Sequence, residues 1–169
     1  MGALRIYAIT VFAVLLLSLT EAGATAEQRV ALVIGNGAYE SAPLRNPVND
    51  AQDIADALRK MGFEVIHKEN ASKRSMVEAI DKFDAKLRKS EVGLFYFAGH
   101  GMQIKGRNYL IPVGVRVSSE TDVEFEAVDA GRILGKMEEA GNKLNIVVAI
   151  LEPKISIVAA HDFKMICIV

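Results

Sequence analysis

The segment Val92–Gly101, which reads VGLFYFAGHG, most constrains the fold of this 169-residue chain. Its first half is a short run of apolar and aromatic residues, which indicates a buried β-strand rather than a helix. The run ends at His100, which stands between two glycines. In open α/β sheets, ligands bind at the carboxyl ends of the strands. An imidazole at that position is suited to proton transfer near neutral pH. The alternative is that His100 caps a loop and its glycines only make the turn.

Apolar runs alternate with stretches of helical periodicity over most of the chain. This alternation predicts an α/β fold with a mainly parallel sheet and helices on both faces. Besides the strand in Val92–Gly101, the expected strands are Arg29–Ile34, Phe63–His67, Asn108–Pro112 and Leu144–Leu151, and the expected helices are Asn46–Met61, Ser72–Leu87 and a short one around Ile133–Met137. We expect residues 102–107 and 113–128 to be loops.

The first apolar run ends in a Gly-Asn-Gly sequence at residues 35–37, which forces a turn. The turn does not fit a dinucleotide-binding loop, since Glu40 stands at the third glycine position and two prolines follow. The next helix has Pro47 at a suitable first position and Asp50 in its first turn. Negative charge there complements the helix dipole, which is a structural explanation for Asp50, and a role in binding stays open.

Residues 1–26 are interpreted as a secretory signal peptide. A short basic start precedes the uninterrupted apolar run Ile6–Leu19, which is shorter than the roughly 20 residues of a transmembrane helix. Small residues at Ala24 and Ala26 fit the cleavage pattern, so we expect a cut before Glu27 and export to the periplasm or the medium. After cleavage no membrane contact is expected. The alternative is an uncleaved membrane anchor.

Charge and cysteine content argue against several kinds of partner and site. The formal net charge is −1 and no basic patch stands out, which argues against nucleic acid as a partner. Cys167 is the one cysteine, so no internal disulfide can form and the domain must rely on its core. The adjacent pair His161 and Asp162 is weak support for a metal site, and we predict neither a metal nor a cofactor.

Six motifs along the chain occur together in one known family. They are RVALVIGNGAY at 29–39, LRNPVND at 44–50, the segment 58–65, FYFAGHG at 95–101, NYLIP at 108–112 and NIVV at 145–148. In this order and spacing they resemble the caspase-like cysteine peptidase family (peptidase C14), and especially its metacaspase-type members. The resemblance implies a three-layer α/β sandwich of the p20 type at residues 27–148, preceded by the signal at 1–26 and followed by an unrelated tail at 149–169.

The resemblance also implies a reaction and site residues. The family cleaves peptide bonds with a His–Cys dyad, and His100 matches the histidine that assists the thiolate and protonates the leaving amine. Gly101 matches the glycine whose backbone N–H helps to hold the oxyanion. Asp50 matches an acidic position that in metacaspases helps to bind an Arg or Lys side chain, although Ala98 replaces a pocket serine of some relatives. The implied partner is a peptide or protein.

The chain departs from the family after residue 148. The family continues with roughly Leu-Asp-Ala-Cys-Arg, in which the cysteine is the nucleophile and the aspartate helps to shape the basic pocket. This chain reads AILEPK at 149–154 and has neither residue there, and Cys167 in the apolar tail is expected to be inert. We therefore predict a cysteine-type endopeptidase domain that is inactive as written, with its C-terminal part incomplete.

Two origins fit this departure. The chain could be a natural truncated or decayed copy, or a frameshift could have replaced the true C-terminal part. A decayed copy would act as a non-catalytic module that binds peptides or proteins, or it would be a non-functional fragment with exposed strand edges.

Overall fold

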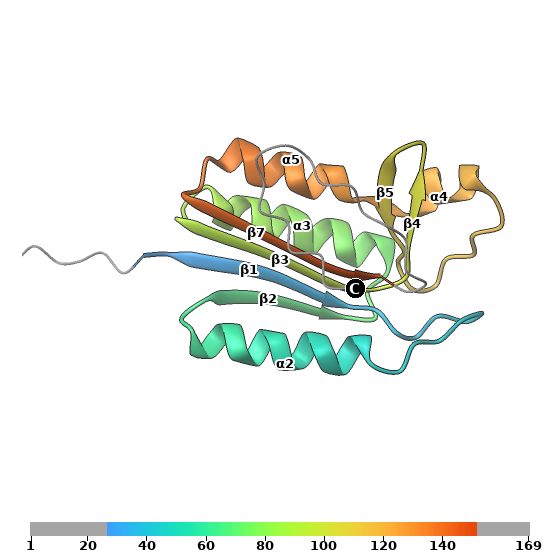
Figure 1. Ribbon diagram of the computed structural model, residues 1–169, viewed down its shortest axis with the longest axis horizontal. Helices are drawn as coiled ribbons and strands as arrows, with labels where there is room; N and C mark the ends of the chain where they lie inside the picture. The colour runs from blue at the N-terminus through green and yellow to red at the C-terminus, as the bar shows by residue number, and fades with distance from the viewer. Residues whose placement is uncertain (1–26, 152–169) are drawn as a thin grey trace, which may run out of the picture.

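Four parallel strands form the central sheet of the computed structural model, which describes residues 27–151 (Figure 1). They lie in the order β2-β1-β3-β7 and are β1 (Arg29–Gly35), β2 (Glu64–Glu69), β3 (Val92–Gly99) and β7 (Leu144–Leu151). β1 and β3 lie inside the sheet and are almost continuously apolar, because both of their faces are covered. The predicted parallel sheet is confirmed.

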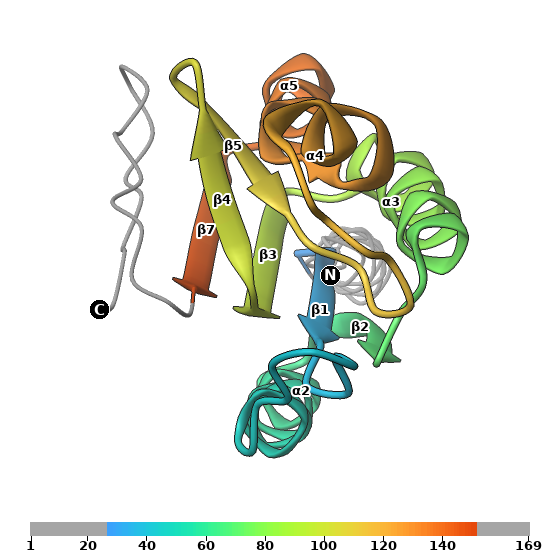
Figure 2. The same ribbon diagram turned by 90° about the vertical axis from the view of Figure 1, so that its right-hand side faces the viewer.

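Helices cover both faces of the sheet and make a three-layer sandwich (Figure 2). One face is covered by α2 (Pro47–Lys60), and the other by α3 (Lys73–Leu87) and α5 (Ala130–Ala140). The larger core lies under α3 and α5 and includes the fully buried aromatic residues Phe83 and Phe97. The smaller core lies under α2, where small residues such as Ala51 allow the helix to approach the sheet closely. This arrangement confirms the predicted α/β sandwich.

A second, smaller sheet and a short helix replace the two predicted loops. The antiparallel strands are β4 (Gly101–Ile104), β5 (Arg107–Leu110) and β6 (Val128–Asp129), and the helix is α4 (Glu120–Glu126). The β4–β5 turn has positive φ at Lys105 (51°) and Gly106 (78°), which suits a tight hairpin. A capping box between Ser119 and Asp122 fixes α4, which buries only Val123 and so lacks apolar periodicity. The strand predicted at 108–112 corresponds to β5, whereas the prediction of loops at 102–107 and 113–128 was wrong.

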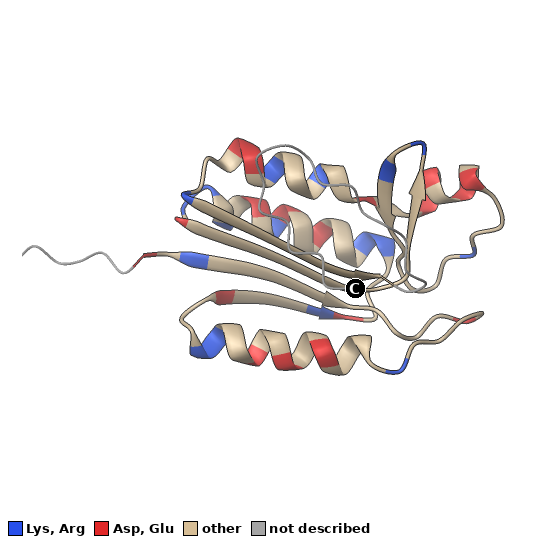
Figure 3. Cartoon of the chain, in the orientation of Figure 1, with Lys and Arg blue, Asp and Glu red and all other residues tan. Residues whose placement is uncertain are grey.

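The longer helices α2, α3 and α5 carry charged residues of both signs, whereas α4 carries only acidic ones (Figure 3). Between α3 and α5, Lys136 contacts Asp84 at 2.8 Å and Asp81 at 3.5 Å. Arg132 contacts Asp81 at 3.4 Å. The hydrogen bond from Lys136 holds the pKa of Asp84 below its ordinary value. These pairs link the two helices that cover one face of the sheet.

One buried imidazole should make the fold sensitive to acid. His67 lies on β2 with its side chain 12% exposed, and its Nε2 is 3.7 Å from a carboxylate oxygen of Glu69. Burial lowers the pKa of His67, and the nearby Glu69 charge opposes this shift only in part. The folded protein then binds a proton less readily than the unfolded chain does. The free energy of unfolding should therefore fall as the pH decreases through the ordinary histidine value of 6.5.

Urea unfolding at about pH 7.5 and about pH 5.5 measures this effect. His67→Gln cannot titrate at this position, so its stability should depend less on pH than that of the parent. Carboxylates elsewhere titrate in both proteins and cancel in the comparison. Identical pH dependence in the parent and the variant would show that His67 does not contribute.

Candidate functional site

His100 lies at the carboxyl edge of the parallel sheet, where the two sheets meet. β3 ends at Gly99, and β4 begins at Gly101. A Cβ at Gly99 would lie 2.6 Å from the Tyr39 hydroxyl oxygen, so the close approach of these groups requires glycine. A Cβ at Gly101 would lie 2.7 Å from the Leu151 side chain, which places Gly101 against the end of β7.

The imidazole of His100 is half-buried and contacted on two sides. Its Nε2 lies 2.7 Å from the carbonyl oxygen of Ala42. Its ring lies against the ring of Tyr39, with centroids 4.3 Å apart and planes inclined at 48°. A carbonyl oxygen can only accept, so Nε2 donates its proton to Ala42. In the neutral ring the lone pair is then on Nδ1, which makes Nδ1 the basic nitrogen.

Hydrogen bonds also fix the backbone of His100. Its N–H donates to the Tyr39 hydroxyl oxygen at 3.0 Å, and its carbonyl accepts from the Ile111 N–H at 3.0 Å. The Tyr39 hydroxyl donates in turn to the Ile111 carbonyl at 2.9 Å. Burial raises the pKa of Tyr39 to about 12, so the hydroxyl keeps its proton at neutral pH and remains a donor.

Two asparagines anchor the loop between β1 and α2. Asn36 is fully buried, accepts from the Ala71 N–H at 2.8 Å and donates to the Ile111 carbonyl at 3.2 Å. Asn70 Oδ1 accepts from the two backbone N–H groups of residues 37–38, each at 2.9 Å. The residues of this loop predict only a turn, because a single sequence carries no signal for side chains that reach across to another segment.

A pocket of about 310 Å³ lies at the same edge of the sheet. Its lining comes from the start of α2 and the ends of β3 and β7, and includes Arg45, Asp50, Ala98, Gly99 and Ile150. His100 does not itself line the pocket, but Gly99, which does, immediately precedes it, and Ala42, which contacts its ring, immediately precedes the lining residue Pro43. Asp50 is exposed in the first turn of α2, and its charge adds to burial in raising the pKa of Tyr96 to about 12. The structure thus brings Asp50 and His100 to one edge.

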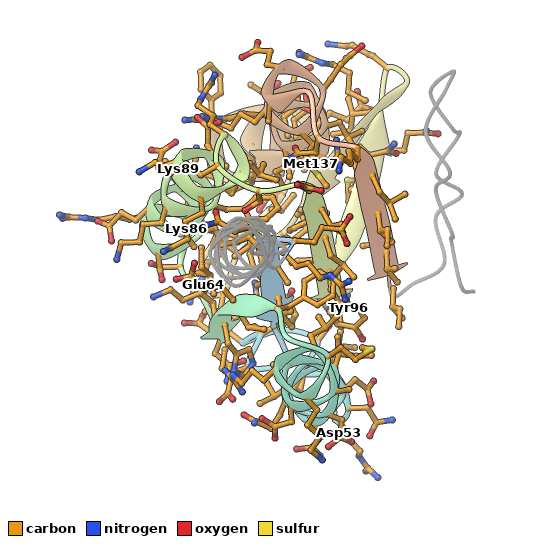
Figure 4. The ribbon with its side chains drawn as sticks, turned by 90° about the vertical axis from the view of Figure 1, so that its left-hand side faces the viewer. Asp53, Glu64, Lys86, Lys89, Tyr96 and Met137 are labelled. Carbon is orange, nitrogen blue, oxygen red and sulfur yellow. The ribbon has the colours of Figure 1, made fainter. Side chains whose placement is uncertain are left out.

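A larger hollow of about 630 Å³ lies at the opposite, amino-terminal edge of the sheet. Lys86 and Glu64 meet there at 2.6 Å, and Lys89 also lines the hollow (Figure 4). Neither His100 nor Asp50 lines it. Of these two hollows, the smaller pocket is the candidate site, because Asp50 and Gly99, the residue before His100, line it.

Several predictions from the sequence concern residues outside 27–151. The signal peptide at 1–26, the tail from residue 152 on, Cys167 and the pair His161 and Asp162 fall there, while residues 149–151 of the predicted tail form the end of β7. Within the described range, no helix is long and apolar enough to cross a membrane. The same residues contain no group of three His, Cys, Asp or Glu side chains that could hold a metal ion.

A family model described as the caspase domain matches residues 28–145 of this chain. The human mucosa-associated lymphoid tissue lymphoma translocation protein 1 and its mouse homologue are each 36% identical to it over 89 residues. Each match covers 52% of this chain and 11% of the relative. The chain therefore aligns with only about a tenth of the length of these relatives.

Two solved structures are similar in fold. The Drosophila initiator caspase Dronc gives a TM-score of 0.54 at 11% identity, over 77% of this chain and 50% of that chain. A protein from Geobacter sulfurreducens gives a TM-score of 0.55 at 14% identity, over 72% and 49% of the two chains. At these identities the similarity concerns the fold alone.

Proposed function

The chain belongs to the caspase domain family, and from this premise we propose that residues 27–148 bind peptide side chains beside His100 and Asp50 without cleaving the peptide. It is a cysteine-endopeptidase-type domain that lacks its nucleophile as written. Where the family has the cysteine, after β7, this chain has Glu152. Without a thiolate the acyl-enzyme of the family cannot form. Peptide cleavage is then a property of the family to which the domain belongs, and peptide binding is the role proposed for this chain.

The observation that carries this proposal is that Asp50 and Gly99, the residue before His100, line one pocket. Gly99, in the pocket wall, leads directly into His100, while Asp50 comes from α2 on another side of the pocket. A peptide along this edge could place one side chain in the pocket and its backbone beside the imidazole. With a thiol at residue 152, His100 would act as base and then as acid, and the Gly101 N–H would hold the oxyanion.

The lining of the pocket determines which side chain it accepts. Asp50 offers one carboxylate, whereas Ala98 and Ile150 are apolar. Ile150 also stands where the family resemblance places a second pocket aspartate. Arg45 lines the pocket and offsets part of the negative charge. We therefore expect Arg and Lys side chains to bind, with a modest preference over an uncharged side chain of similar length.

Asp50→Asn should remove most of that preference. The expected loss of affinity for an Arg-containing peptide is about tenfold, because a charge-assisted hydrogen bond is replaced by a neutral one. Isothermal titration with matched Arg and Gln peptides measures it. Asp53→Asn is the control, because Asp53 is exposed on the same helix but does not line the pocket (Figure 4). Equal losses in both variants, or no binding by the parent, would contradict the proposal.

An active endopeptidase is the second candidate, and it depends on the reading frame of the gene. The motif expected after Val148 is missing, although the preceding residues match the family. Resequencing codons 140–169 and the nucleotides that follow is the test. A corrected frame with Asp-x-Cys after Val148 would restore the nucleophile and the peptidase, and an unchanged frame would leave the binding role.

Export and cooperative folding complete the proposal. N-terminal sequencing of the protein isolated from cells should find Glu27 first, in the periplasm or the medium, and a start at Met1 would contradict cleavage of the signal. Heating the purified protein should give one cooperative transition. A gradual loss of structure without a transition would favour a non-functional fragment instead.

A further inference from the structure

Tyr39 contacts His100 through both its ring and its hydroxyl group. The ring lies beside the imidazole, with centroids 4.3 Å apart, and the hydroxyl oxygen accepts the His100 N–H at 3.0 Å. The same hydroxyl donates to the Ile111 carbonyl, while the Ile111 N–H donates to the His100 carbonyl. Tyr39 thus completes a cycle of hydrogen bonds that holds the peptide groups on both sides of His100.

Burial and position in the chain suit Tyr39 to act on the imidazole. Tyr39 is 8% exposed, so water competes little for its hydroxyl group. The same loop presents the Ala42 carbonyl oxygen to His100 Nε2 at 2.7 Å. One loop therefore contacts the ring at its face and at one nitrogen. Displacing that loop would change the orientation and the tautomer of the ring together.

The loop is held in turn from the end of β2. Asn70 accepts both backbone N–H groups of residues 37–38, immediately before Tyr39. Asn70 has a φ of 46°, a conformation that asparagine adopts more readily than most residues. Substitution of Asn70 would therefore act on Tyr39 through the backbone of the loop.

We propose that Tyr39 is a positioning residue for His100, which it holds so that Nε2 donates to Ala42 and the lone pair stays on Nδ1. The purpose of this positioning rests on the proposed function, because a histidine with a fixed tautomer suits a site that binds and orients peptides. The contacts of Tyr39 with His100 require neither a nucleophile nor a bound peptide. The two proposals can therefore be tested separately in the chain as written.

Nuclear magnetic resonance of the ¹⁵N-labelled chain tests the proposal. Tyr39→Phe keeps the ring and removes the hydroxyl group. We expect the His100 amide to exchange with solvent up to about tenfold faster, as for one lost hydrogen bond. We also expect the Nε2–H signal of the parent to be lost as both tautomers become populated. Tyr109→Phe is the control, since Tyr109 is 4% exposed in the same core cluster, and it should leave both signals unchanged.

A Tyr39→Phe spectrum that keeps the Nε2–H signal and the ring tautomer of the parent would overturn the proposal. If that variant does not fold, Asn70→Ala should cause the same loss of signal, and an unchanged signal there overturns the proposal equally. Peptide titration of the same samples separates the two proposals. A parent that binds no peptide but loses the Nε2–H signal on Tyr39→Phe would refute the binding role and support the positioning role.

Discussion

A variant with Glu152→Cys and Ile150→Asp is expected to form a covalent adduct with a peptide that carries an electrophile after arginine. The two changes supply a thiol and an aspartate at the positions where the family resemblance places the nucleophile and the pocket aspartate. The partner of the thiol is His100, which follows the neighbouring strand β3. A positioned base typically accelerates such a step about a hundred- to ten-thousandfold. The adduct should therefore form about a hundredfold faster, or more, than in the same variant with His100→Ala.

Mass spectrometry of the labelled protein over time gives both rates. All variants carry Cys167→Ala, so the label can attach only to the introduced thiol. Equal rates with and without His100 would contradict its role as the base. Tight peptide binding without any adduct would mean that the strand end does not bring a thiol to the imidazole.

Gly35→Ala should destabilise the domain by about 3 kcal/mol. A Cβ at residue 35 would lie 2.4 Å from the Pro47 carbonyl oxygen and 2.7 Å from the Ala51 Cβ. Both neighbours belong to α2, and one of them is backbone, so the clash is relieved only by moving the helix away from β1. Peptide affinity should fall as well, because α2 carries Asp50 into the pocket.

Gly135→Ala is the matched control for that substitution. Gly135 lies in α5, and a Cβ there would meet nothing within 4 Å. Alanine is the better helix former, so the free energy of unfolding should rise by up to about 1 kcal/mol. Urea unfolding should move the midpoints of the two variants in opposite directions. A Gly35→Ala variant as stable as the parent would contradict the close packing of β1 against α2.

Long elements of this fold were predictable because burial leaves a regular pattern in the sequence. β1 and β3 are continuous apolar runs, and α3 repeats its buried residues at helical spacing, as in Met76, Ile80, Phe83 and Leu87. Strand β4, its turn into β5, and α4 were not predictable in this way, although a strand at 108–112 was predicted. Each is short and partly exposed, and its structure depends on a turn or a cap rather than on a buried face.

The candidate site was also predictable only in part. His100 and Asp50 lie in family motifs at the ends of elements, so the sequence pointed to both. The contacts of Tyr39 and Ala42 with His100 join distant parts of the chain, and no local pattern encodes them. The oxyanion role of Gly101 stays a prediction, as does the missing nucleophile.

β7 is the outer strand of the described sheet, and within residues 27–151 it pairs only with β3. The wall that Ile150 gives to the pocket therefore exists only after β7 has docked. That pairing joins segments separated by a hairpin and two helices, and the entropic cost of closing this connection precedes the stabilisation that the pairing gives. By mass action, a peptide bound in the pocket would favour molecules in which β7 is paired with β3. A peptide in the pocket would therefore stabilise the outer strand of the sheet as well as bind to it.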